Sequence, residues 1–202
     1  MSNSNFSGII VLQTDFGTTD GTVNETKGVI HSIEKSLIIS DLTHEITPFN
    51  IFEAAYRLYQ TATYWPEGTI FVSVVDPGVG TQRKSIILKS KTGHYFISPD
   101  NGTLTLINQF LGTEEIIEIN EKANIMPRAN SSTSHGRDLY CYVAARLASG
   151  KISLEEVGTK LSTELIQFHY EQANINTTNQ LIGTIAIHDR YGNIWMNIDL
   201  EY

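Results

Sequence analysis

Cysteine is nearly absent from this sequence, since Cys141 is the single one among 202 residues. One cysteine excludes an intramolecular disulfide and a zinc site built from several thiolates. Because Cys141 lies in the apolar run 139–145, we interpret it as a small buried hydrophobic residue. The sequence has no H-x-x-x-H pair and no other spacing of His, Cys, Asp and Glu that is typical of metal ligands. We therefore expect no metal site.

Long apolar runs and basic clusters are also missing. No apolar run approaches the ~20 residues that span a bilayer, and residues 1–5 lack the basic start of a signal peptide. The formal net charge is −8 and the pI is about 5.2, without any run of Lys or Arg. A nucleic-acid partner requires a basic face. We expect a cytoplasmic protein with no membrane and no nucleic-acid partner, whose acidity suits a cationic small molecule.

Three common catalytic or nucleotide-binding motifs are absent. The sequence contains no G-x-S-x-G, no Walker A and no G-x-G-x-x-G motif. The short segment Gly78-Val79-Gly80 does not amount to a dinucleotide fingerprint. These absences argue against an α/β-hydrolase elbow, a P-loop and a Rossmann-type site.

Apolar patterning predicts an α/β fold at the start of the chain. With 41% hydrophobic and 18% charged residues, the chain is able to bury a core. Short β-branched runs alternate with helical spacing, which predicts a mostly parallel sheet with flanking helices and right-handed crossovers. A loop is expected at 41–48. The expected strands are 8–12, 37–39 and 69–74, and the expected helices are 23–33 and 51–62.

The rest of the chain predicts a hairpin, further helices and a domain boundary. Polar residues 174–180 mark the boundary, which gives an N-terminal α/β domain at 1–173. Residues 174–202 then hold a linker and the first hairpin of a small, incomplete all-β domain, because one hairpin cannot bury its own core. The other expected elements are paired strands at 85–89 and 94–98, a helix at 104–110, a strand at 116–119, a loop at 123–134, a strong helix at 136–149, a helical turn at 154–157 and strands at 181–188 and 194–198.

A carboxylate and a guanidinium follow the third expected strand. Asp76 comes directly after this buried run, and Arg83 follows it after a glycine-containing loop. Ligands of open α/β sheets bind outside the carboxyl ends of strands. An Asp and an Arg at such a place are able to share one small polar ligand. The alternative is that Asp76 begins a turn and Arg83 is a solvated charge.

Other polar and aromatic residues follow neighbouring strands. Asp15 and Asp20 come after the first strand, Phe49 after the second, and His135 precedes the long helix. A parallel sheet places these loops at one edge. A histidine before a helix N-terminus feels the positive end of the dipole, and a neutral imidazole accepts a proton. The alternatives are that Asp15 caps a helix or turn, Asp20 forms a turn, and His135 is a surface or capping residue.

Taken together, these segments resemble the S-adenosyl-L-methionine (SAM) hydrolases that form adenosine. This family is also called the SAM hydroxide adenosyltransferases and is related to the fluorinase and the chlorinase. The order and spacing of the segments hold over nearly the whole chain. The matching segments are Thr14-Asp15-Phe16-Gly17 with Asp20, Lys27-Gly28-Val29-Ile30, His44-Glu45-Ile46-Thr47-Pro48-Phe49, Tyr64-Trp65-Pro66-Glu67-Gly68-Thr69, Val75-Asp76-Pro77-Gly78-Val79-Gly80-Thr81 with Arg83, Pro99-Asp100-Asn101-Gly102, His135-Gly136-Arg137-Asp138 and Tyr191-Gly192-Asn193-Ile194-Trp195.

The resemblance implies a fold and an assembly. The family has a larger N-terminal α/β domain and a smaller, barrel-like C-terminal β domain, and it forms trimers whose sites lie between neighbouring subunits. Its second domain continues past the segment that matches residues 191–195. The resemblance therefore implies that some adenine and methionine contacts come from positions beyond Tyr202, and we expect the 202-residue chain to bind SAM weakly.

The resemblance also implies roles for single residues. Asp76, Arg83 and His135 match the set that positions and activates a water in the hydrolases, whereas the halogenating relatives have replaced this set. Gly136 stands where the fluorinase has a halide-binding serine. The binding positions are Asp15 for the ribose hydroxyls, Phe49 for the nucleoside and sulfonium region, Asn193 for the adenine edge, and Asp20, Thr22 and Asp189 for the methionine part.

The activity implied by the resemblance is hydrolysis of SAM to adenosine and L-methionine, with SAM as a substrate and no cofactor. Water or hydroxide would attack the ribose 5′ carbon, because the sulfonium makes that carbon electrophilic. One alternative is a module that binds SAM or adenosine without turning it over. The other is a halide-dependent relative, which the intact set of Asp76, Arg83 and His135 disfavours. Product analysis separates these alternatives.

Overall fold

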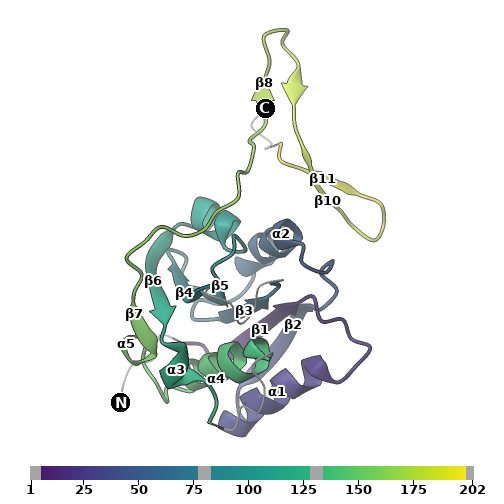
Figure 1. Ribbon diagram of the computed structural model, residues 1–202. Coiled ribbons are helices and arrows are strands. Elements are labelled where there is room, and N and C mark those ends of the chain that lie inside the picture. The colour runs from purple at the N-terminus through teal and green to yellow at the C-terminus, as the bar shows by residue number, and fades with distance from the viewer. Residues whose placement is uncertain (1–5, 77–82, 128–133, 199–202) are drawn as a thin grey trace. The chain divides into compact units, whose positions relative to one another are not determined.

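The computed structural model describes residues 6–76, 83–127 and 134–198. The chain divides into two compact units, residues 1–167 and residues 168–202. Each unit is described by itself. The first unit carries a single seven-stranded sheet among its described residues, with helices on both faces (Figure 1).

The sheet is mostly parallel, as the alternating pattern predicts. The strand order is β2-β1-β3-β5-β4-β6-β7. The neighbours β2, β1, β3 and β5 pair in parallel, while β4 runs antiparallel between β5 and β6, and β7 runs antiparallel to β6. The strands are β1 (Ile9–Thr14), β2 (Ile38–Thr43), β3 (Ile70–Val74), β4 (Ser85–Ser90), β5 (Tyr95–Pro99), β6 (Thr113–Ile119) and β7 (Gly158–Lys160).

Helices cover both faces of this sheet, so its inner strands are buried on both sides and consist largely of apolar residues. In β1, Ile10 and Leu12 pack toward the face that α1 and α4 cover, and Val11 packs toward the face that α2 and η1 cover. The helices are α1 (Thr22–Ile33), α2 (Ile51–Ala62), the π-helix η1 (Ile107–Leu111), α3 (Glu121–Asn124), the π-helix η2 (Gly136–Cys141), α4 (Tyr142–Ala148) and α5 (Leu154–Val157).

The end of β2 differs from the prediction. A loop was expected at 41–48, but β2 continues to Thr43 and pairs Asp41 with Leu12 and Thr43 with Gln13 of β1. Because β2 is the edge strand, it holds polar side chains that face solvent. A half-exposed polar strand has no apolar pattern to reveal it.

The segment before the long helix also differs from the prediction. Part of the expected loop at 123–134 belongs to α3, whose start Asn120 caps by accepting a hydrogen bond from the Ala123 N–H at 3.3 Å. Residues 128–133 lie outside the described residues. The expected helix at 136–149 is present, but it opens as the π-helix η2 before continuing as α4. Strand β7 was not predicted, because its three residues are too few to show a pattern.

The second unit consists of short strands. The strand expected at 181–188 is interrupted at Gly183 and Thr184, where the Thr184 N–H donates to the Asn197 side chain at 2.6 Å. Large apolar side chains such as Ile185 and Ile194 are exposed. The paired strands are β8 (Asn174–Ile175) with β9 (Leu181–Ile182) and β10 (Ile185–His188) with β11 (Ile194–Met196).

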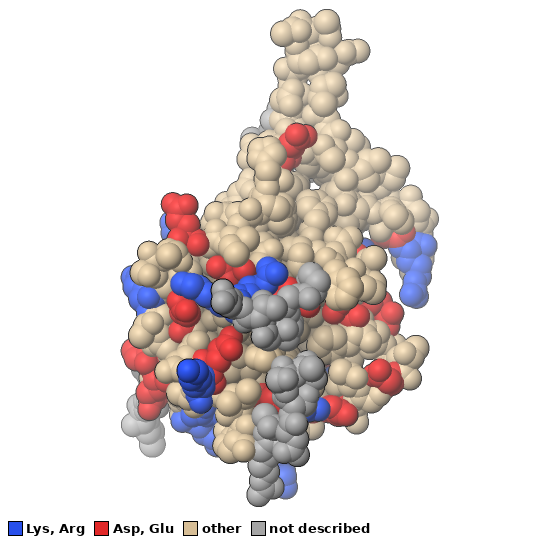
Figure 2. Space-filling view, in the orientation of Figure 1, with Lys and Arg blue, Asp and Glu red and all other residues tan. Residues whose placement is uncertain are grey.

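Cys141 is buried at the end of η2, which confirms its interpretation as a small hydrophobic residue. Burial raises the pKa of its thiol to about 12. Among the described residues, no helix has the length and apolar character needed to cross a membrane. Acidic and basic side chains are mixed over the face shown in Figure 2, without a continuous basic surface.

Candidate functional site

The carboxyl edge of the sheet gathers the polar side chains of the site. Asp15 follows β1, Asp76 follows β3 and Asp100 follows β5, and these three strands are parallel. Because β4 runs in the opposite direction, Arg83 enters the same edge just before that strand begins. Residues distant in the sequence therefore meet at the edge where ligands of α/β sheets bind.

Asp76 and Arg83 form an ion pair at this edge. The Arg83 Nε lies 3.0 Å from the Asp76 Oδ2, and the Asp76 side chain is 0% exposed. A buried carboxylate requires a compensating charge, and the guanidinium supplies it. Arg83 is therefore not the free solvated charge of the alternative interpretation. The intervening residues 77–82 of the predicted motif lie outside the described residues.

His135 lies directly before η2, and its side chain is 14% exposed. Its Nε2 is 3.8 Å from the Glu121 Oε2. Nearby, burial raises the pKa of the Tyr140 phenol, the negative charges of Glu121 and Asp76 raise it further, and Arg83 opposes the rise. The Tyr140 hydroxyl thus feels the charges of the Asp76–Arg83 pair and of Glu121. Sequence reasoning missed Glu121 and Tyr140 because neither belongs to a spacing that points to chemistry.

Asp15 fixes the loop that carries Phe49. Its Oδ2 accepts a hydrogen bond from the Phe49 N–H at 2.9 Å. Phe49 has a φ of +66°, a left-handed conformation that is unfavourable for a non-glycine residue. Asn50 next to it caps α2 by accepting from the Glu53 N–H at 3.0 Å. Asp15 and the cap together hold an otherwise strained residue, whose exposed ring forms part of a cavity wall.

A cavity of about 320 Å³ opens at this place. Four of the predicted site residues line it, and the neighbours of His135 on both sides do so as well. Apolar walls beside carboxylates suit a ligand that has both an aromatic and a cationic part. The lining residues are Asp15, Phe16, Thr22, Glu25, Pro48, Phe49, Val74, Asp76, Ser134, Gly136 and Arg137.

Gly136 allows two apolar side chains to close one wall of this cavity. A Cβ at this position would lie 3.1 Å from the Phe16 ring and 3.3 Å from a Val74 methyl group. Such contacts are tighter than ordinary packing, so a larger residue would push Phe16 aside. Gly136 therefore sets the shape of the cavity beside His135.

Arg137 is a cavity residue that sequence reasoning did not single out, although it lies inside the segment that begins at His135. It makes two hydrogen bonds to Asp138, at 2.6 Å and 2.9 Å, and one to Glu25 at 2.6 Å. These carboxylates raise the pKa of the guanidinium above its usual range. Arg137 thus ties the start of η2 to α1 and adds a positive charge to an acidic cavity.

Asp20 and Thr22 differ in their position relative to the cavity. The Asp20 carboxylate is exposed and accepts a hydrogen bond from the Thr22 N–H at 2.8 Å, which lowers its pKa. Asp20 is not among the residues that line the cavity, whereas Thr22 is. The structure therefore shows Asp20 in a turn at the start of α1, outside the lining of this cavity.

Asp189 and Asn193 belong to the second unit, where they bond to each other. The Asn193 side-chain amide donates to the Asp189 Oδ2 at 2.7 Å, and the Asp189 Oδ1 accepts from the N–H groups of Tyr191 and Asn193 at 2.9 Å. The Asn193 amide and these N–H groups lower the pKa of Asp189. Both residues shape the turn between β10 and β11.

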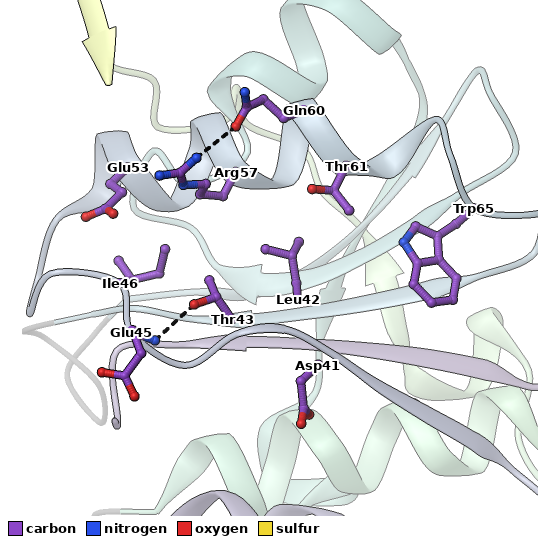
Figure 3. Close-up of a pocket in the computed structure, with 10 residues that line it drawn as sticks. All are labelled: Asp41, Leu42, Thr43, Glu45, Ile46, Glu53, Arg57, Gln60, Thr61 and Trp65. Atoms are coloured by element: carbon purple, nitrogen blue, oxygen red, sulfur yellow. Dashed lines mark hydrogen bonds between the residues drawn. The ribbon is translucent and has the colours of Figure 1, made fainter. Parts of the chain in front are cut away.

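A second hollow of about 490 Å³ lies between the end of β2 and α2 (Figure 3). Arg57 and Glu53 reach toward it from α2, and the carboxylates of Asp41 and Glu45 come from β2 and the following loop. The Arg57 guanidinium is bonded to Gln60 at 3.2 Å. None of the predicted site residues lines this hollow, so the cavity beside Asp76 is the candidate site.

Asp100 gives a testable pH dependence at the same edge. Its carboxylate is buried and accepts from the Ile166 N–H at 2.9 Å, and burial raises its pKa above the ordinary value of 3.8. The folded state therefore holds this proton more tightly than the unfolded state. The stability from Asp100 is fully present below the unfolded-state pKa and is lost as pH rises through the folded-state pKa.

We expect Asp100→Asn to remove this pH-dependent loss of stability, because asparagine does not ionise. Its amide oxygen can still accept the hydrogen bond from the Ile166 N–H. The difference in melting temperature between the variant and wild type should therefore be more in favour of the variant at pH 7 than at pH 4. Calorimetry of both proteins at the two pH values measures this difference. Each kcal/mol corresponds to about 2–4 °C for a chain of this size. A variant that loses stability relative to wild type as pH rises would contradict the assignment.

Among the described residues, no three of His, Cys, Asp and Glu gather as metal ligands.

Comparisons with known proteins show which proteins resemble this chain. The chain is 40% identical over 195 residues to the (R)-S-adenosyl-L-methionine hydrolase of Methanocaldococcus jannaschii, covering 94% of this chain and 66% of that protein. It is 30% identical over 222 residues to the fluorinase of Actinopolyspora mzabensis, covering 98% of this chain and 74% of that protein.

The solved structures and the family comparison agree with these relatives. A crystal structure of an uncharacterized conserved protein from Thermotoga maritima superposes with a TM-score of 0.88 at 39% identity, covering 96% of this chain and 72% of that chain. Residues 10–158 match the model of the SAM hydroxide adenosyltransferase N-terminal domain. The matched segment contains the whole cavity and the Asp76–Arg83 pair. The chain therefore belongs to the SAM hydroxide adenosyltransferase family.

Proposed function

We propose that this chain hydrolyses S-adenosyl-L-methionine to adenosine and L-methionine. The observation that carries the proposal is the buried Asp76 paired with Arg83, on the wall of a cavity that also holds Asp15 and Phe49. Relatives from Methanocaldococcus jannaschii, Salinispora arenicola and Thermus thermophilus are named (R)-S-adenosyl-L-methionine hydrolases, which supports it. The chain spans 66% of the length of the first of these.

The proposed reaction is an in-line displacement by water. The water oxygen forms a bond to the ribose 5′ carbon while the bond from that carbon to sulfur breaks, and the electron pair stays on sulfur in the neutral thioether of methionine. Asp76 accepts a hydrogen bond from the water and orients it, and His135 takes its proton. Arg83 holds Asp76 in place through the 3.0 Å contact and offsets charge as the water gains hydroxide character.

The cavity offers matching groups for the substrate. The Asp15 carboxylate uses one acceptor site for the Phe49 N–H and keeps others for the ribose diol. The exposed Phe49 ring offers a surface for the nucleoside. Asp15, Asp76 and Glu25 make the cavity acidic, which suits a sulfonium cation. The proposed further contacts are Asp20, Thr22 and Asp189 for the methionine part and Asn193 for the adenine edge.

The resemblance to the family also bears on assembly, location, cofactors and partners. We infer a homotrimer in the cytoplasm that uses neither a metal nor a cofactor and has no nucleic-acid partner. The mixed charges over the face shown in Figure 2 and the net charge of −8 support the absence of a nucleic-acid partner.

Isotope labelling tests the reaction. In ¹⁸O-water, the protein should release adenosine that carries the label on its 5′ hydroxyl, because the attacking oxygen comes from water. Mass spectrometry of adenosine measures the label, and a heat-denatured sample is the control. Unlabelled adenosine contradicts direct attack by water. Recovery of intact SAM after incubation with an excess of protein identifies a binding module, and a halide requirement identifies a halogenating relative.

A further inference from the structure

Glu121 faces the imidazole of His135, although the two residues belong to different elements. Glu121 is the first residue of α3, and His135 precedes η2. The Glu121 Oε2 lies 3.8 Å from the His135 Nε2, with side-chain exposures of 37% and 14%. A negative charge at this separation attracts a ring that gains a proton. The proposed reaction leaves the role of Glu121 unassigned.

A chain of hydrogen bonds holds the Glu121 carboxylate. The Ser85 hydroxyl donates to the Glu121 Oε1 at 2.5 Å, and the same hydroxyl lies 2.8 Å from the Tyr140 hydroxyl. Serine has one hydroxyl proton, which is given to Glu121, so Tyr140 must donate to Ser85. The buried phenol retains its proton because burial raises its pKa. The chain therefore runs in one direction, from Tyr140 through Ser85 to Glu121.

This arrangement leaves the second carboxylate oxygen for the histidine. The Glu121 Oε1 is engaged by Ser85, while the Oε2 faces the His135 Nε2. A carboxylate beside one ring nitrogen favours the tautomer with the proton on that nitrogen. The proton then resides on Nε2, and Nδ1 is the atom that receives the proton of the water.

We propose that Glu121 is a positioning residue for His135, which selects the Nε2–H tautomer and stabilises the imidazolium that forms when the ring takes a proton. The inference rests on the proposed function. Glu121 acts through His135 and touches neither the water nor the substrate. Ser85 and Tyr140 keep its carboxylate in place while the proton moves.

A double-mutant cycle tests this coupling. Glu121→Gln keeps an oxygen for Ser85 and removes the charge, so kcat should fall about 10–100-fold, as for other groups that orient a ligating or catalytic imidazole. KM should change little, because Glu121 lies outside the cavity lining. Glu121→Gln should cause no further loss in the His135→Ala background, because its effect passes through the ring.

Glu118→Gln is the matched control. Glu118 on β6 is 39% exposed and pairs with Lys84 at 2.8 Å, so the substitution removes a similar charge from a similar surface. Its kcat should stay near the wild-type value. A normal kcat in Glu121→Gln, together with an impaired His135→Ala, overturns the inference and leaves the proposed function standing. Equal fractional losses from Glu121→Gln in both backgrounds also overturn it.

A second measurement does not depend on turnover. Long-range ¹H–¹⁵N correlation spectra report which ring nitrogen carries the proton, and the His135→Ala spectrum identifies the signals of His135 among those of the six histidines. The wild-type protein should show the Nε2–H tautomer, and Glu121→Gln should shift the population toward Nδ1–H. A wild-type ring in the Nδ1–H tautomer refutes the role of Glu121 even if the protein hydrolyses SAM. Absent hydrolysis with the expected tautomer refutes the proposed function alone.

Discussion

Asp76→Asn is expected to lower kcat for SAM hydrolysis by about 10²-fold or more, in the range of groups that act on a reacting proton. The amide has the same shape, but it cannot accept two strong hydrogen bonds or balance the charge of Arg83. The ion pair at 3.0 Å and the full burial of the Asp76 side chain motivate this expectation. Stopped assays that quantify adenosine by chromatography measure the loss.

Folding should survive this change, since Arg83 is 30% exposed and keeps access to water. Glu114→Gln is the control, because it breaks the 2.6 Å ion pair with Lys89 at an exposed position away from the cavity. Circular dichroism melting curves should show that both variants are folded at the assay temperature. A rate for Asp76→Asn within about threefold of wild type, well below the loss expected for a group of this kind, would remove Asp76 from the reaction.

Asp15→Ala is expected to weaken adenosine binding by about 10–100-fold. The substitution removes the acceptor for the ribose diol and also releases the Phe49 N–H, which Asp15 holds at 2.9 Å. A lost hydrogen bond to a charged group costs about 1.5–3 kcal/mol, and each ~1.4 kcal/mol is a tenfold change in affinity. Isothermal titration with adenosine measures the change.

Asp20→Ala provides the comparison for this experiment. Asp20 is an exposed turn residue on the same loop, and it is assigned to the methionine part, which adenosine lacks. Its substitution should change the adenosine affinity by less than about threefold, which is below 1 kcal/mol. Should Asp15→Ala also leave the affinity unchanged, Asp15 serves only to hold the Phe49 loop.

The buried parts of the fold were predictable because burial leaves a pattern in the sequence. Helix α2 has the expected bounds, and the hairpin of β4 and β5 pairs as predicted, since apolar spacing and a Thr-Gly turn specify both. The length of the edge strand β2 was underestimated because the polar residues at its end join the sheet through backbone pairing, which leaves no apolar pattern in the sequence. The break at Gly183 depends on a hydrogen bond to Asn197, thirteen positions further on. No local pattern reports such a contact.

The same distinction applies to the candidate site. The proximity of Asp76 and Arg83 was predictable because a carboxylate and a guanidinium follow a buried strand. Glu121 and Tyr140 were not predicted. Glu121 follows β6 and comes close to His135, and Tyr140 lies on η2 next to Ser85 of β4. Both approaches depend on the pairing of β4 with β6 and on the packing of η2. Ser85 joins them from the first position of β4. These contacts arise between elements, so the spacing of residues in the sequence does not contain them.

The strand order bears on when Asp76 and Arg83 meet during folding. Asp76 follows β3 and Arg83 precedes β4, but β5 lies between these two strands in the sheet. Because contacts between segments close in sequence form more readily than distant ones, we expect the local β4–β5 hairpin to form before the parallel pairing of β5 with β3. In that order of events, the ion pair forms only after the hairpin has docked onto β3. A partly folded chain that has formed the hairpin alone carries Arg83 without its carboxylate, so under the proposed function it should not hydrolyse its substrate SAM before the sheet is assembled.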